Sequence, residues 1–382
     1  MSKARPKLCL FTSSFGHGGT EHQFVELVTR LDREKYDVTV ACQRYFGQFY
    51  QQVKDAGLRV VLFPLQGLLS MRTARTSWDW MRFIRREKFD LLHTFDFYTN
   101  VFGAPLARLA GIRLLLTSRR DLGHIWSKSR QRMLRAAFHW SDFVIANSDA
   151  ARDQLIAEEN VPESRIRVLR NGVDLTRYSS NGHGPGKRNE LGYSNGELVV
   201  GTIANLRPEK GHHFLLEAAA EVVKKVPQAR FFFVGTGELE NELKRIVQEK
   251  GLVPYVSFLG MRDDVPKLFS AMDLMVLPSS SESLPNVVLE AMSCGRAVIV
   301  SDTGACGELV ESGRTGQVIP PQNPQVLAKT IIELLEQPAL RERLGRAARL
   351  HAEEEFDIHV AVRRLEAIYD ELLARGARGA SA

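Results

Sequence analysis

The feature that most constrains this chain is a regular alternation of short apolar runs with longer amphipathic stretches, from residue 7 onward. Apolar runs such as "KLCLFTS", "YDVTVAC" and "DLMVLPS" have the length of buried strands. The stretches between them, such as "HHFLLEAAAEVVKKV", repeat apolar residues at helical spacing. Strands separated by helical stretches of about 10–15 residues favour βαβ units and parallel sheets. The chain is therefore predicted to be α/β.

The alternation is interrupted at "YSSNGHGPGKRNELGYSNGE" (178–197), which is rich in Ser, Gly and Asn. Because domains usually contain about 100–200 residues, a chain of 382 residues suits two of them. We expect two doubly wound, Rossmann-like domains at 1–180 and 197–358 that face each other across a cleft. A linker at 181–196 would join them, and a C-terminal helix and tail at 359–382 would cross back to the first domain.

The first strand is followed by a glycine-rich loop, "FTSSFGHGGTEHQF". Ligands of doubly wound sheets bind at loops that follow the carboxyl ends of strands. Gly16, Gly18 and Gly19 permit a tight turn there, and Thr20 can cap the next helix. Glu21 occupies the position of a third fingerprint glycine, which weakens a nicotinamide-dinucleotide site without excluding it. Both a ligand loop and a plain turn remain open.

Three loops in the second half carry cations or glycines. "GTIANLRPEKGHHF" places Arg207 and Lys210 before a helix that begins near Gly211. Cations beside a helix N-terminus suit a phosphate, although a solvated turn is the alternative. "FFFVGTGELENEL" adds Gly235 after a strand, and "FLGMRDDVPKLF" adds Arg262.

The stretch "PSSSESLPNVVLEAMSCG" (278–295) holds two glutamates, Glu282 and Glu290. Glu290 lies among apolar residues, where a buried carboxylate needs a partner. Pro285 fits the first helical position, the helix N-terminus attracts anions, and Gly295 suits the helix end. This arrangement predicts an anion site flanked by Glu282 and by a Glu290 that binds vicinal hydroxyls. The alternative is a surface glutamate and a buried one paired with the backbone.

Charge is distributed unevenly along the chain. Residues 1–180 carry 28 Lys and Arg against 18 Asp and Glu, whereas the remainder carries 23 against 27. Much of the excess lies in "RTARTSWDWMRFIRREKFD" and "HIWSKSRQRMLRAAFHW". These segments predict amphipathic helices whose arginines are solvated, the favoured interpretation, or face an anionic membrane.

No pattern predicts a metal site. The four cysteines are scattered, no His/Cys cluster occurs, and no two aspartates stand two positions apart. A bound diphosphate would therefore be neutralised by Arg, Lys and helix ends. The N-terminal apolar run is too short for a signal peptide, and no run is long enough to span a bilayer. We expect a cytoplasmic protein.

Several motifs together resemble the family-4 retaining glycosyltransferases of the two-Rossmann (B-type) fold. They are "GHGGTEH", "RNGVDLTRY", "LRPEKGHHFLLEA", "FVGTGE", "FLGMRDDV" and "PSSSESLPNVVLEAMSCGRAVIVSDTGACGELV". The E-x7-E spacing of Glu282 and Glu290 is the most specific of them. The resemblance implies a metal-independent, cofactor-free hexosyltransferase that moves a sugar from a nucleoside diphosphate sugar to a hydroxyl acceptor with retention. The first domain would bind the acceptor and the second the donor.

The resemblance also implies roles for residues of this chain. Glu282 would contact the donor sugar, Glu290 the ribose hydroxyls and Lys210 the diphosphate. The implied catalytic group is Glu282, Lys210 and Arg207. The implied donor-binding residues are Gly18, Gly19, Asn205, Gly235, Arg262, Leu284, Asn286, Val287 and Glu290. The acceptor-side candidates are His93, Arg119, Arg120 and Asp121.

Two departures from the family pattern affect these roles. Asn205 stands where the family commonly has an arginine, and Arg207, on the same side of an extended strand, is the hypothesised substitute. Where a histidine often follows the fifth strand, "LLLTSRRDLG" has Arg119. Arg119, Arg120 and Asp121 are therefore candidates to orient the acceptor. His93 is another candidate, for which a structural role is an equal alternative.

We expect a role in cell-surface polysaccharide or glycolipid assembly. The expected partners are a nucleotide-sugar donor, a sugar or lipid-linked acceptor, and peripherally the anionic inner face of a membrane, but not nucleic acid. A nucleotide-sugar epimerase and a non-catalytic nucleotide-sugar-binding protein remain alternatives. A phosphorylase would normally need a pyridoxal lysine, and no sequence feature marks one.

Overall fold

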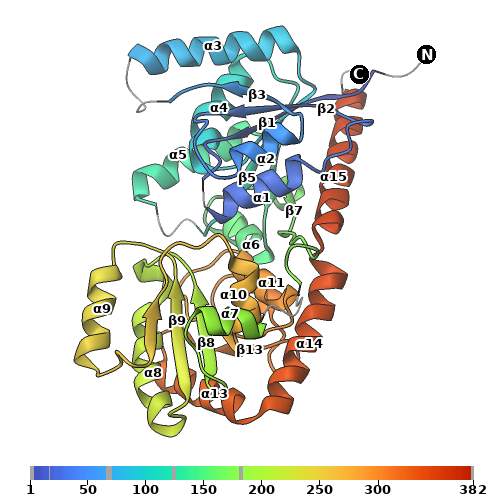
Figure 1. The fold of residues 1–382 in the computed structure, drawn as a ribbon. Helices are drawn as coiled ribbons and strands as arrows, with labels where there is room; N and C mark the ends of the chain where they lie inside the picture. The colour runs from blue at the N-terminus through green and yellow to red at the C-terminus, as the bar shows by residue number, and fades with distance from the viewer. Residues whose placement is uncertain (1–3, 17, 66–70, 123–125, 180–183, 380–382) are drawn as a thin grey trace. The chain divides into compact units, whose positions relative to one another are not determined.

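The computed structural model describes residues 4–16, 18–65, 71–122, 126–179 and 184–379. The chain divides into two compact units, Met1–Gly172 with Ile358–Ala382, and Val173–Asp357. Each unit is a parallel sheet with helices packed on it (Figure 1). The predicted α/β class with two parallel-sheet domains is confirmed. A cleft between the domains stays a prediction.

In the first unit, the described strands form a seven-stranded parallel sheet in the order β3-β2-β1-β4-β5-β6-β7. The strands are β1 Lys7–Thr12, β2 Asp37–Cys42, β3 Arg59–Leu62, β4 Leu91–Thr94, β5 Leu114–Arg119, β6 Phe143–Ala146 and β7 Ile166–Val168. The helices are α1 Gly19–Val28, α2 Tyr50–Asp55, α3 Met71–Glu87, α4 Phe97–Leu109, α5 Lys128–Trp140, α6 Asp149–Ala157, the 3-10 turn Glu163–Arg165 and α15 Ile358–Gly379. The strand order reverses between β1 and β4, which makes that boundary the topological switch point.

Side chains alternate along β1, and both sets are buried, as expected for a parallel sheet covered on both faces. Leu10 belongs to one core cluster with Phe24 of α1. Phe11 belongs to the other, where its ring stacks on Trp80 of α3 at 4.5 Å between centroids. Helices therefore cover both faces of the first sheet.

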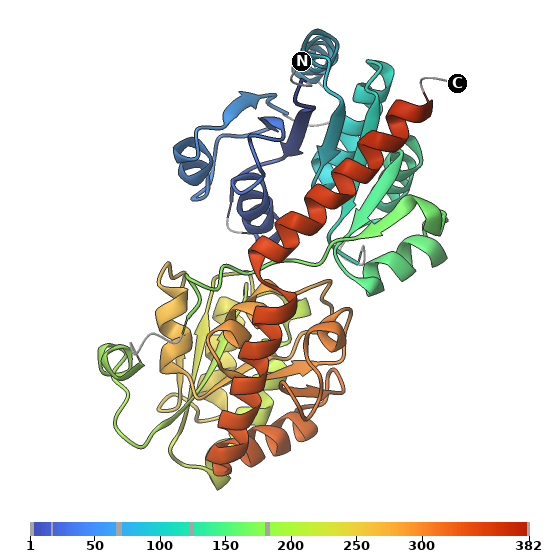
Figure 2. The same ribbon diagram turned by 90° about the vertical axis from the view of Figure 1, so that its right-hand side faces the viewer.

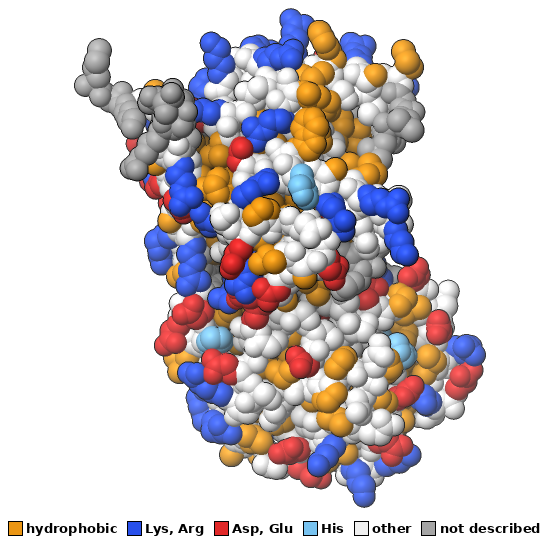
Figure 3. Space-filling model, turned by 180° about the vertical axis from the view of Figure 1, so that it is seen from behind, with side chains coloured by type: hydrophobic (Ala, Val, Ile, Leu, Met, Phe, Trp, Pro, Cys, Tyr) orange, Lys and Arg blue, Asp and Glu red, His pale blue; other side chains and the backbone are white. Residues whose placement is uncertain are grey.

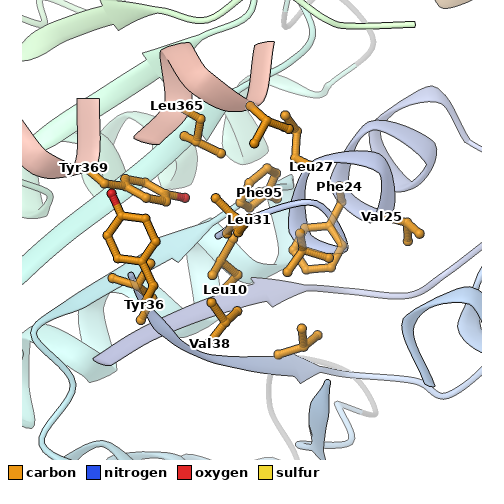
Figure 4. Packing of buried hydrophobic residues seen from close by; sticks show 14 of the residues in the cluster. Leu10, Phe24, Val25, Leu27, Leu31, Tyr36, Val38, Phe95, Leu365 and Tyr369 are labelled. Carbon is orange, nitrogen blue, oxygen red and sulfur yellow. The ribbon is translucent and has the colours of Figure 1, made fainter. Parts of the chain in front are cut away.

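The C-terminal helix α15 completes the core of the first unit, as the sequence predicted (Figure 2). Leu365 and Tyr369 are fully buried in the same cluster as Leu10. Figure 4 shows Tyr369 beside Tyr36, and their ring centroids lie 6.3 Å apart. The Tyr36 hydroxyl donates a hydrogen bond to Asp370 Oδ1 (2.7 Å). A segment from the end of the chain is thus part of its first domain.

The second unit contains a six-stranded parallel sheet in the order β10-β9-β8-β11-β12-β13 among the described residues. The strands are β8 Leu198–Ile203, β9 Ala229–Val234, β10 Val256–Phe258, β11 Leu274–Leu277, β12 Ala297–Ser301 and β13 Gln317–Ile319. The helices are α7 Gly184–Glu190, the 3-10 turn Pro208–Lys210, α8 His212–Lys225, α9 Glu240–Glu249, α10 Val265–Ala271, α11 Asn286–Ser293, α12 Cys306–Leu309, α13 Pro324–Glu336 and α14 Pro338–Glu355.

The boundary between the units differs from the sequence expectation. The chain divides after Gly172 rather than at 180, and the segment expected as a linker contains α7. Arg188 of α7 donates to the carbonyl of Ala271 (2.9 Å) and forms an ion pair with Asp273. The polar residues that suggested solvent therefore bind the body of the second unit. Residues 181–183 of the expected linker and 380–382 of the tail lie outside the described residues.

The two basic segments form α3 and α5. On α3, Trp80 and Phe83 are buried in the core, whereas Trp78 is 61 % exposed. Figure 3 shows Lys and Arg side chains with hydrophobic ones among them at the end of the first unit. Within the described ranges, no helix is long and apolar enough to cross a membrane.

Candidate active site

Two loops meet at the switch point of the second sheet. Strands β8 and β11 are neighbours, although the chain forms β9 and β10 between them, so loops 204–211 and 278–285 leave the same edge. The N–H of Ser280 donates to the carbonyl of Glu209 (2.8 Å) and joins the loops. Gly211 has φ +68°, and a Cβ there would lie 2.0 Å from the carbonyl oxygen of Pro278. Only glycine allows this approach.

Lys210 and Glu282 form an ion pair at this switch point. Lys210 Nζ lies 2.6 Å from Glu282 Oε1, and the hydroxyl of Ser279 donates to the same oxygen (2.7 Å). The Glu282 side chain is 8 % exposed and that of Lys210 is 23 % exposed. Limited access of water strengthens their attraction. Two residues of the predicted catalytic group are thus in contact, and Ser279, which no sequence argument singled out, belongs with them.

Asn205 and Arg207 lie on the exposed side of the first of these loops. Strand β8 ends at Ile203, and the N–H of Arg207 donates to the carbonyl of Asn205 (2.8 Å) in a tight turn. The extended strand that the sequence prediction assumed therefore ends before Asn205, although both side chains are exposed. The Arg207 guanidinium forms no hydrogen bond or ion pair with a described residue, and its role as the substitute cation stays a prediction.

The second loop leads into α11. Pro285 immediately precedes the helix, one position earlier than expected, and Asn286 and Val287 form the start of its first turn. Leu284 is buried at 5 % exposure. The helix ends at Ser293, and Gly295 follows with φ +67°, as predicted. The helix N-terminus, with its partial positive charge, therefore begins next to the loop that carries Glu282.

The burial of the two glutamates is the opposite of what the alternative of a surface Glu282 and a buried Glu290 requires. Glu282 in the polar loop is almost fully buried, whereas Glu290, among apolar neighbours, is only half-buried. Val287 and Glu290 are three residues apart and share the more open side of α11, while Val288 and Leu289 face the core. The helical period thus gives Glu290 access to solvent within an apolar stretch.

Glycines bring the loops after β8, β9 and β10 together. Gly235 has φ +130°, and a Cβ there would lie 2.2 Å from the carbonyl oxygen of Ala204. Its N–H donates to the carbonyl of Gly260 (2.8 Å). The third loop also carries Arg262, whose Nε lies 2.8 Å from Asp264 Oδ1. The hydrogen bonds from Arg262 hold the pKa of Asp264 well below its usual range. Arg262, expected beside the base, is therefore already engaged within its own unit.

In the first unit, the glycine-rich loop leads directly into α1. The helix begins at Gly19 with Gly18 at the N-cap position, so Thr20 does not cap it as expected. A Cβ on Gly18 would lie 2.1 Å from Glu21 Oε2. Burial raises the pKa of the Glu21 carboxyl. Gly18 and Gly19 are thus at the start of a helix, as a ligand loop requires, with an acidic side chain close by.

A second carboxylate, Asp96, lies at the switch point of the first sheet and was missed by the sequence analysis. Its Oδ2 accepts from the N–H of Ser13 (2.6 Å) and its Oδ1 from the N–H of Thr99 (3.1 Å). The N–H of Asp96 donates in turn to Thr99 Oγ1 (3.1 Å), which completes a capping box for α4. The D-x-x-T pattern after a strand was the available signal. Burial raises the pKa of this carboxyl.

His93 is fully buried at the end of β4. Its Nδ1 lies 2.8 Å from the hydroxyl of Tyr369, and its Nε2 lies 2.8 Å from the hydroxyl of Ser118. Burial lowers the pKa of His93 well below its ordinary value, so the ring is neutral at physiological pH. Because both ring nitrogens connect elements of the core, the structure favours the structural role for His93.

Arg119 points into the body of the first unit and is 1 % exposed. Its Nη2 lies 3.4 Å from Gln154 Oε1 and 3.7 Å from Glu159 Oε1. Its Nη1 lies 3.9 Å from Asp121 Oδ1, and Asp121 also accepts a hydrogen bond from the indole of Trp126 (3.3 Å). These contacts give Arg119 and Asp121 partners within the unit.

Arg120 faces a different environment from its neighbour. Its Nη2 donates to Asn171 Oδ1 (2.5 Å), and its guanidinium lies 5.9 Å from the centroid of the Phe95 ring. Burial lowers the pKa of Arg120 to about 10. Of the four acceptor-side candidates, it is the one whose charge has no carboxylate within ion-pair distance among the described residues.

In the part of the chain that the structure describes, no group of three His, Cys, Asp or Glu side chains could hold a metal ion. The positive charge next to Glu282 belongs to Lys210. The expectation that the reaction needs neither a metal nor a cofactor stays a prediction.

The sequence matches two family models. Residues 17–177 match the model described as Glycosyltransferase Family 4, and residues 185–351 match the model described as Glycosyl transferases group 1. The chain is 27 % identical over 305 residues to an Escherichia coli UDP-Gal:alpha-D-GlcNAc-diphosphoundecaprenol alpha-1,3-galactosyltransferase, covering 76 % of this chain and 77 % of the relative. It is 30 % identical over 250 residues to the Corynebacterium jeikeium D-inositol 3-phosphate glycosyltransferase, covering 63 % of this chain and 59 % of the relative.

Solved structures give the same result for the fold. The Anabaena protein HepE in complex with UDP superposes with a TM-score of 0.84 at 26 % identity, covering 96 % of this chain and 100 % of HepE. HepE in complex with UDP-glucose superposes with a TM-score of 0.85 at 26 % identity, covering 96 % of this chain and 99 % of HepE. With both units matched by glycosyltransferase models and the fold shared along nearly the whole chain, this protein belongs to the family-4 glycosyltransferases of the two-Rossmann (B-type) fold, which use nucleotide sugars.

Proposed function

We propose that this protein transfers a hexose from a uridine diphosphate sugar to a hydroxyl of a sugar acceptor, with retention of the anomeric configuration. The observation that carries the proposal is the Lys210–Glu282 ion pair at the switch point of the second unit. HepE has been crystallised with UDP and with UDP-glucose, and the E. coli relative is named for UDP-Gal. These relatives support uridine as the base.

In this proposal, the Lys210 ammonium binds the donor diphosphate and stabilises the charge that develops on the leaving phosphate. Preorganised donors at such a position usually supply the largest part of an enzyme's rate enhancement. Arg207, exposed on the same loop, adds a second cation, and the N-terminus of α11 adds a partial positive charge. In this proposal, Lys210, Arg207 and the N-terminus of α11 neutralise the negative charge of the leaving phosphate.

Glu282 exchanges partners when the donor binds. In the structure its Oε1 accepts from Lys210 and Ser279. Once the ammonium contacts the diphosphate, the carboxylate accepts hydrogen bonds from hydroxyls of the donor sugar, while Glu290 accepts two from the ribose. Retention follows from attack on the face that the leaving group departs from. The leaving phosphate then takes the proton of the acceptor hydroxyl.

The acceptor belongs, in this proposal, to cell-surface polysaccharide or glycolipid assembly. The E. coli relative is named for a diphosphoundecaprenol-linked acceptor, and the C. jeikeium relative for an inositol phosphate. Both printed acceptors carry phosphate on a polyol or sugar. These names support an acceptor in which a sugar hydroxyl lies near a phosphate.

The proposed location is the inner face of an anionic membrane, contacted through α3. Met71 is 89 % exposed and Trp78 61 % exposed on its outer side, where Arg75 and Arg82 are exposed as well. Indole rings and arginines suit the headgroup region of a membrane, because the ring is amphipathic and the guanidinium binds phosphate. The exposed side of α3 supports this contact.

The membrane contact is tested by sedimentation with vesicles. Arg75→Glu and Arg82→Glu should each weaken binding to anionic vesicles by at least about fivefold. Arg245→Glu, on exposed α9 of the second unit, is the control. Equal binding to neutral vesicles, or binding that added salt does not weaken, would contradict the electrostatic contact.

The transfer reaction is tested with purified full-length protein and a panel of UDP sugars, with and without phosphate-bearing acceptors. Release of UDP that depends on the acceptor, with an α-linked product from an α-linked donor, is the expected result. Conversion of the donor sugar without any acceptor would identify an epimerase. Donor binding without turnover across the panel would favour a non-catalytic binding protein.

A further inference from the structure

Two adjacent arginines at the end of β5 differ in how their charge is balanced. The guanidinium of Arg119 has two carboxylates within 4 Å, Glu159 at 3.7 Å and Asp121 at 3.9 Å. The guanidinium of Arg120 has none among the described residues, and its one hydrogen bond goes to the neutral amide of Asn171. The residues outside the described ranges include no Asp or Glu.

The Arg120 guanidinium is also poorly solvated. Its Nη1 is buried and has no hydrogen-bond partner among the described residues, while Nη2 is bonded to Asn171. One side of the group lies over the Phe95 ring. Desolvation is what lowers the pKa of Arg120, and no nearby acid offsets it. A cation removed from water without a counterion destabilises a folded protein unless a partner arrives.

The neighbours of Arg120 keep its charge uncompensated. His93, on the adjacent strand β4, is neutral, and both its nitrogens are occupied by Tyr369 and Ser118. Asp96 at the end of the same strand is bound by the N–H groups of Ser13 and Thr99. Neither side chain forms a hydrogen bond or an ion pair with Arg120, whose charge therefore has no counterion among the described residues.

We infer that Arg120 is a phosphate-binding residue of the first unit, placed by Asn171 and Phe95 at the carboxyl edge of the sheet. A planar guanidinium with one nitrogen anchored and another unpartnered can donate to a phosphate oxygen. The inference rests on the proposed function, because its ligand is the phosphate of the proposed donor or of the proposed acceptor. It gives this chain a second phosphate contact, in the first unit, whereas Lys210 lies in the second.

The test uses the full-length chain and its intrinsic fluorescence. All four tryptophans, Trp78, Trp80, Trp126 and Trp140, belong to the first unit, so thermal unfolding followed by tryptophan emission reports on that unit. Inorganic phosphate should raise the melting temperature of the wild type by about 2–4 °C relative to chloride at equal ionic strength. The Lys210→Gln variant should show the same rise, because its change lies in the other unit.

Arg120→Gln should abolish the rise with phosphate and should increase the melting temperature without phosphate, because an uncompensated cation has been removed. Arg119→Gln is the matched control. It should lower the melting temperature, because Asp121 and Glu159 lose the Arg119 cation and Glu159 keeps only Arg135, and should keep the response to phosphate. A phosphate response that survives in Arg120→Gln would overturn the inference, as would the absence of any response in the wild type.

The affinity for UDP distinguishes the two possible sources of the phosphate, the donor and the acceptor. If Arg120 contacts the donor diphosphate, the Kd for UDP rises at least about fivefold in Arg120→Gln. If it contacts an acceptor phosphate, the Kd for UDP is unchanged and the response to inorganic phosphate is still lost. Neither readout needs turnover. Failure of the transfer assay with an intact phosphate response would therefore count against the proposed function and not against Arg120.

Discussion

The two units have the same architecture but use their switch points differently. In the second, the loops after β8 and β11 present an ion pair, Lys210 and Glu282, joined by Ser279. In the first, the loops after β1 and β4 also bring a carboxylate to the edge, that of Asp96. Its oxygens, however, accept hydrogen bonds from main-chain N–H groups. One edge presents an ion pair, and the other presents a helix cap.

The difference lies in which carboxylate can change partners. Side chains such as those of Lys210 and Ser279 can rotate toward a ligand and release Glu282. Main-chain N–H groups are fixed by the strands and helices that contain them, so Asp96 cannot exchange its partners without unfolding a helix end. A shared fold therefore gives two similar positions, and local hydrogen bonding decides which of them can carry chemistry.

The largest expected effect separates these two carboxylates. Glu282→Gln should reduce transfer by about 100-fold or more, because it removes a charge used on the substrate, and should leave the stability of the first unit unchanged, because Lys210 loses its partner in the second unit only. Asp96→Ala should instead destabilise the first unit by about 2 kcal/mol through loss of the cap. Steady-state kinetics and tryptophan-monitored denaturation measure the two effects. Glu209→Gln, next to Lys210, is the control for a nearby charge. Full activity in Glu282→Gln would remove the distinction.

A second test concerns the contact between the two loops of the second unit. Gly211→Ala should cost several kcal/mol, because strain at φ +68° is added to a Cβ placed 2.0 Å from the carbonyl oxygen of Pro278. Gly251→Ala has a matching φ of +66° with no atom within 4 Å, and should cost only about 1 kcal/mol. Denaturation followed by circular dichroism gives both values. An equal loss of stability in both variants would mean that the close contact of Gly211 with Pro278 contributes nothing to the difference.

A third test compares the buried histidine of each unit. His93 has a partner on both ring nitrogens, whereas neither nitrogen of His212 has one among the described residues. His93→Leu should cost about 2–3 kcal/mol, because the hydroxyls of Tyr369 and Ser118 are left buried and unpaired. His212→Leu should change stability by less than about 1 kcal/mol or increase it. Hydrogen exchange measured separately for the amides of each unit gives the stability change of each variant. The opposite order would show that ring packing outweighs hydrogen bonding.

The smallest effect is a pH dependence that comes from one carboxylate of the second unit, that of Asp264. The pKa of Asp264 is lowered by Arg262, so this carboxylate contributes stability that is fully present above its unfolded value of 3.8. That contribution is lost as the pH falls below 3.8 toward the lower folded value. Because the carboxylate of Asp264 is partly exposed, we expect it to contribute only about 1 kcal/mol to the free energy of unfolding. Denaturation at pH 7 and pH 3 should show a smaller acid loss in Asp264→Asn than in the wild type. An equal loss would exclude this ion pair as its source.

The sequence predicted what depends on local pattern. Lys210 and Glu282 follow neighbouring strands, and the alternation of strands and helices was enough to place them at one edge. The alternative of a surface Glu282 and a buried Glu290 is wrong, because it followed the local composition and not the helical period that exposes Glu290. Arg119 and Arg120 were treated alike, since only the three-dimensional structure shows which of them meets Glu159.

The return of the last helix to the first domain was predicted, but the individual residue contacts between distant segments were not. His93 is held by Tyr369, 276 positions away, and no local pattern connects a strand end to the last helix. The boundary at Gly172 was also missed, because the polar residues of α7 look like a linker until their partners in the second unit are known. Long-range pairing is a property of topology, which hydrophobic periodicity does not encode.

The placement of α15 in the first unit has a consequence for synthesis on the ribosome. Everything that the second unit needs, Val173–Asp357, has been translated before Ile358 is added. The first unit, although its sheet is translated earliest, lacks Leu365 and Tyr369 until α15 has been translated. Domains generally fold in order of emergence, but here the earlier-made domain is the later one to be completed. A nascent or C-terminally shortened chain would therefore display the apolar surface around Leu10 to chaperones and proteases, while its second domain was already finished.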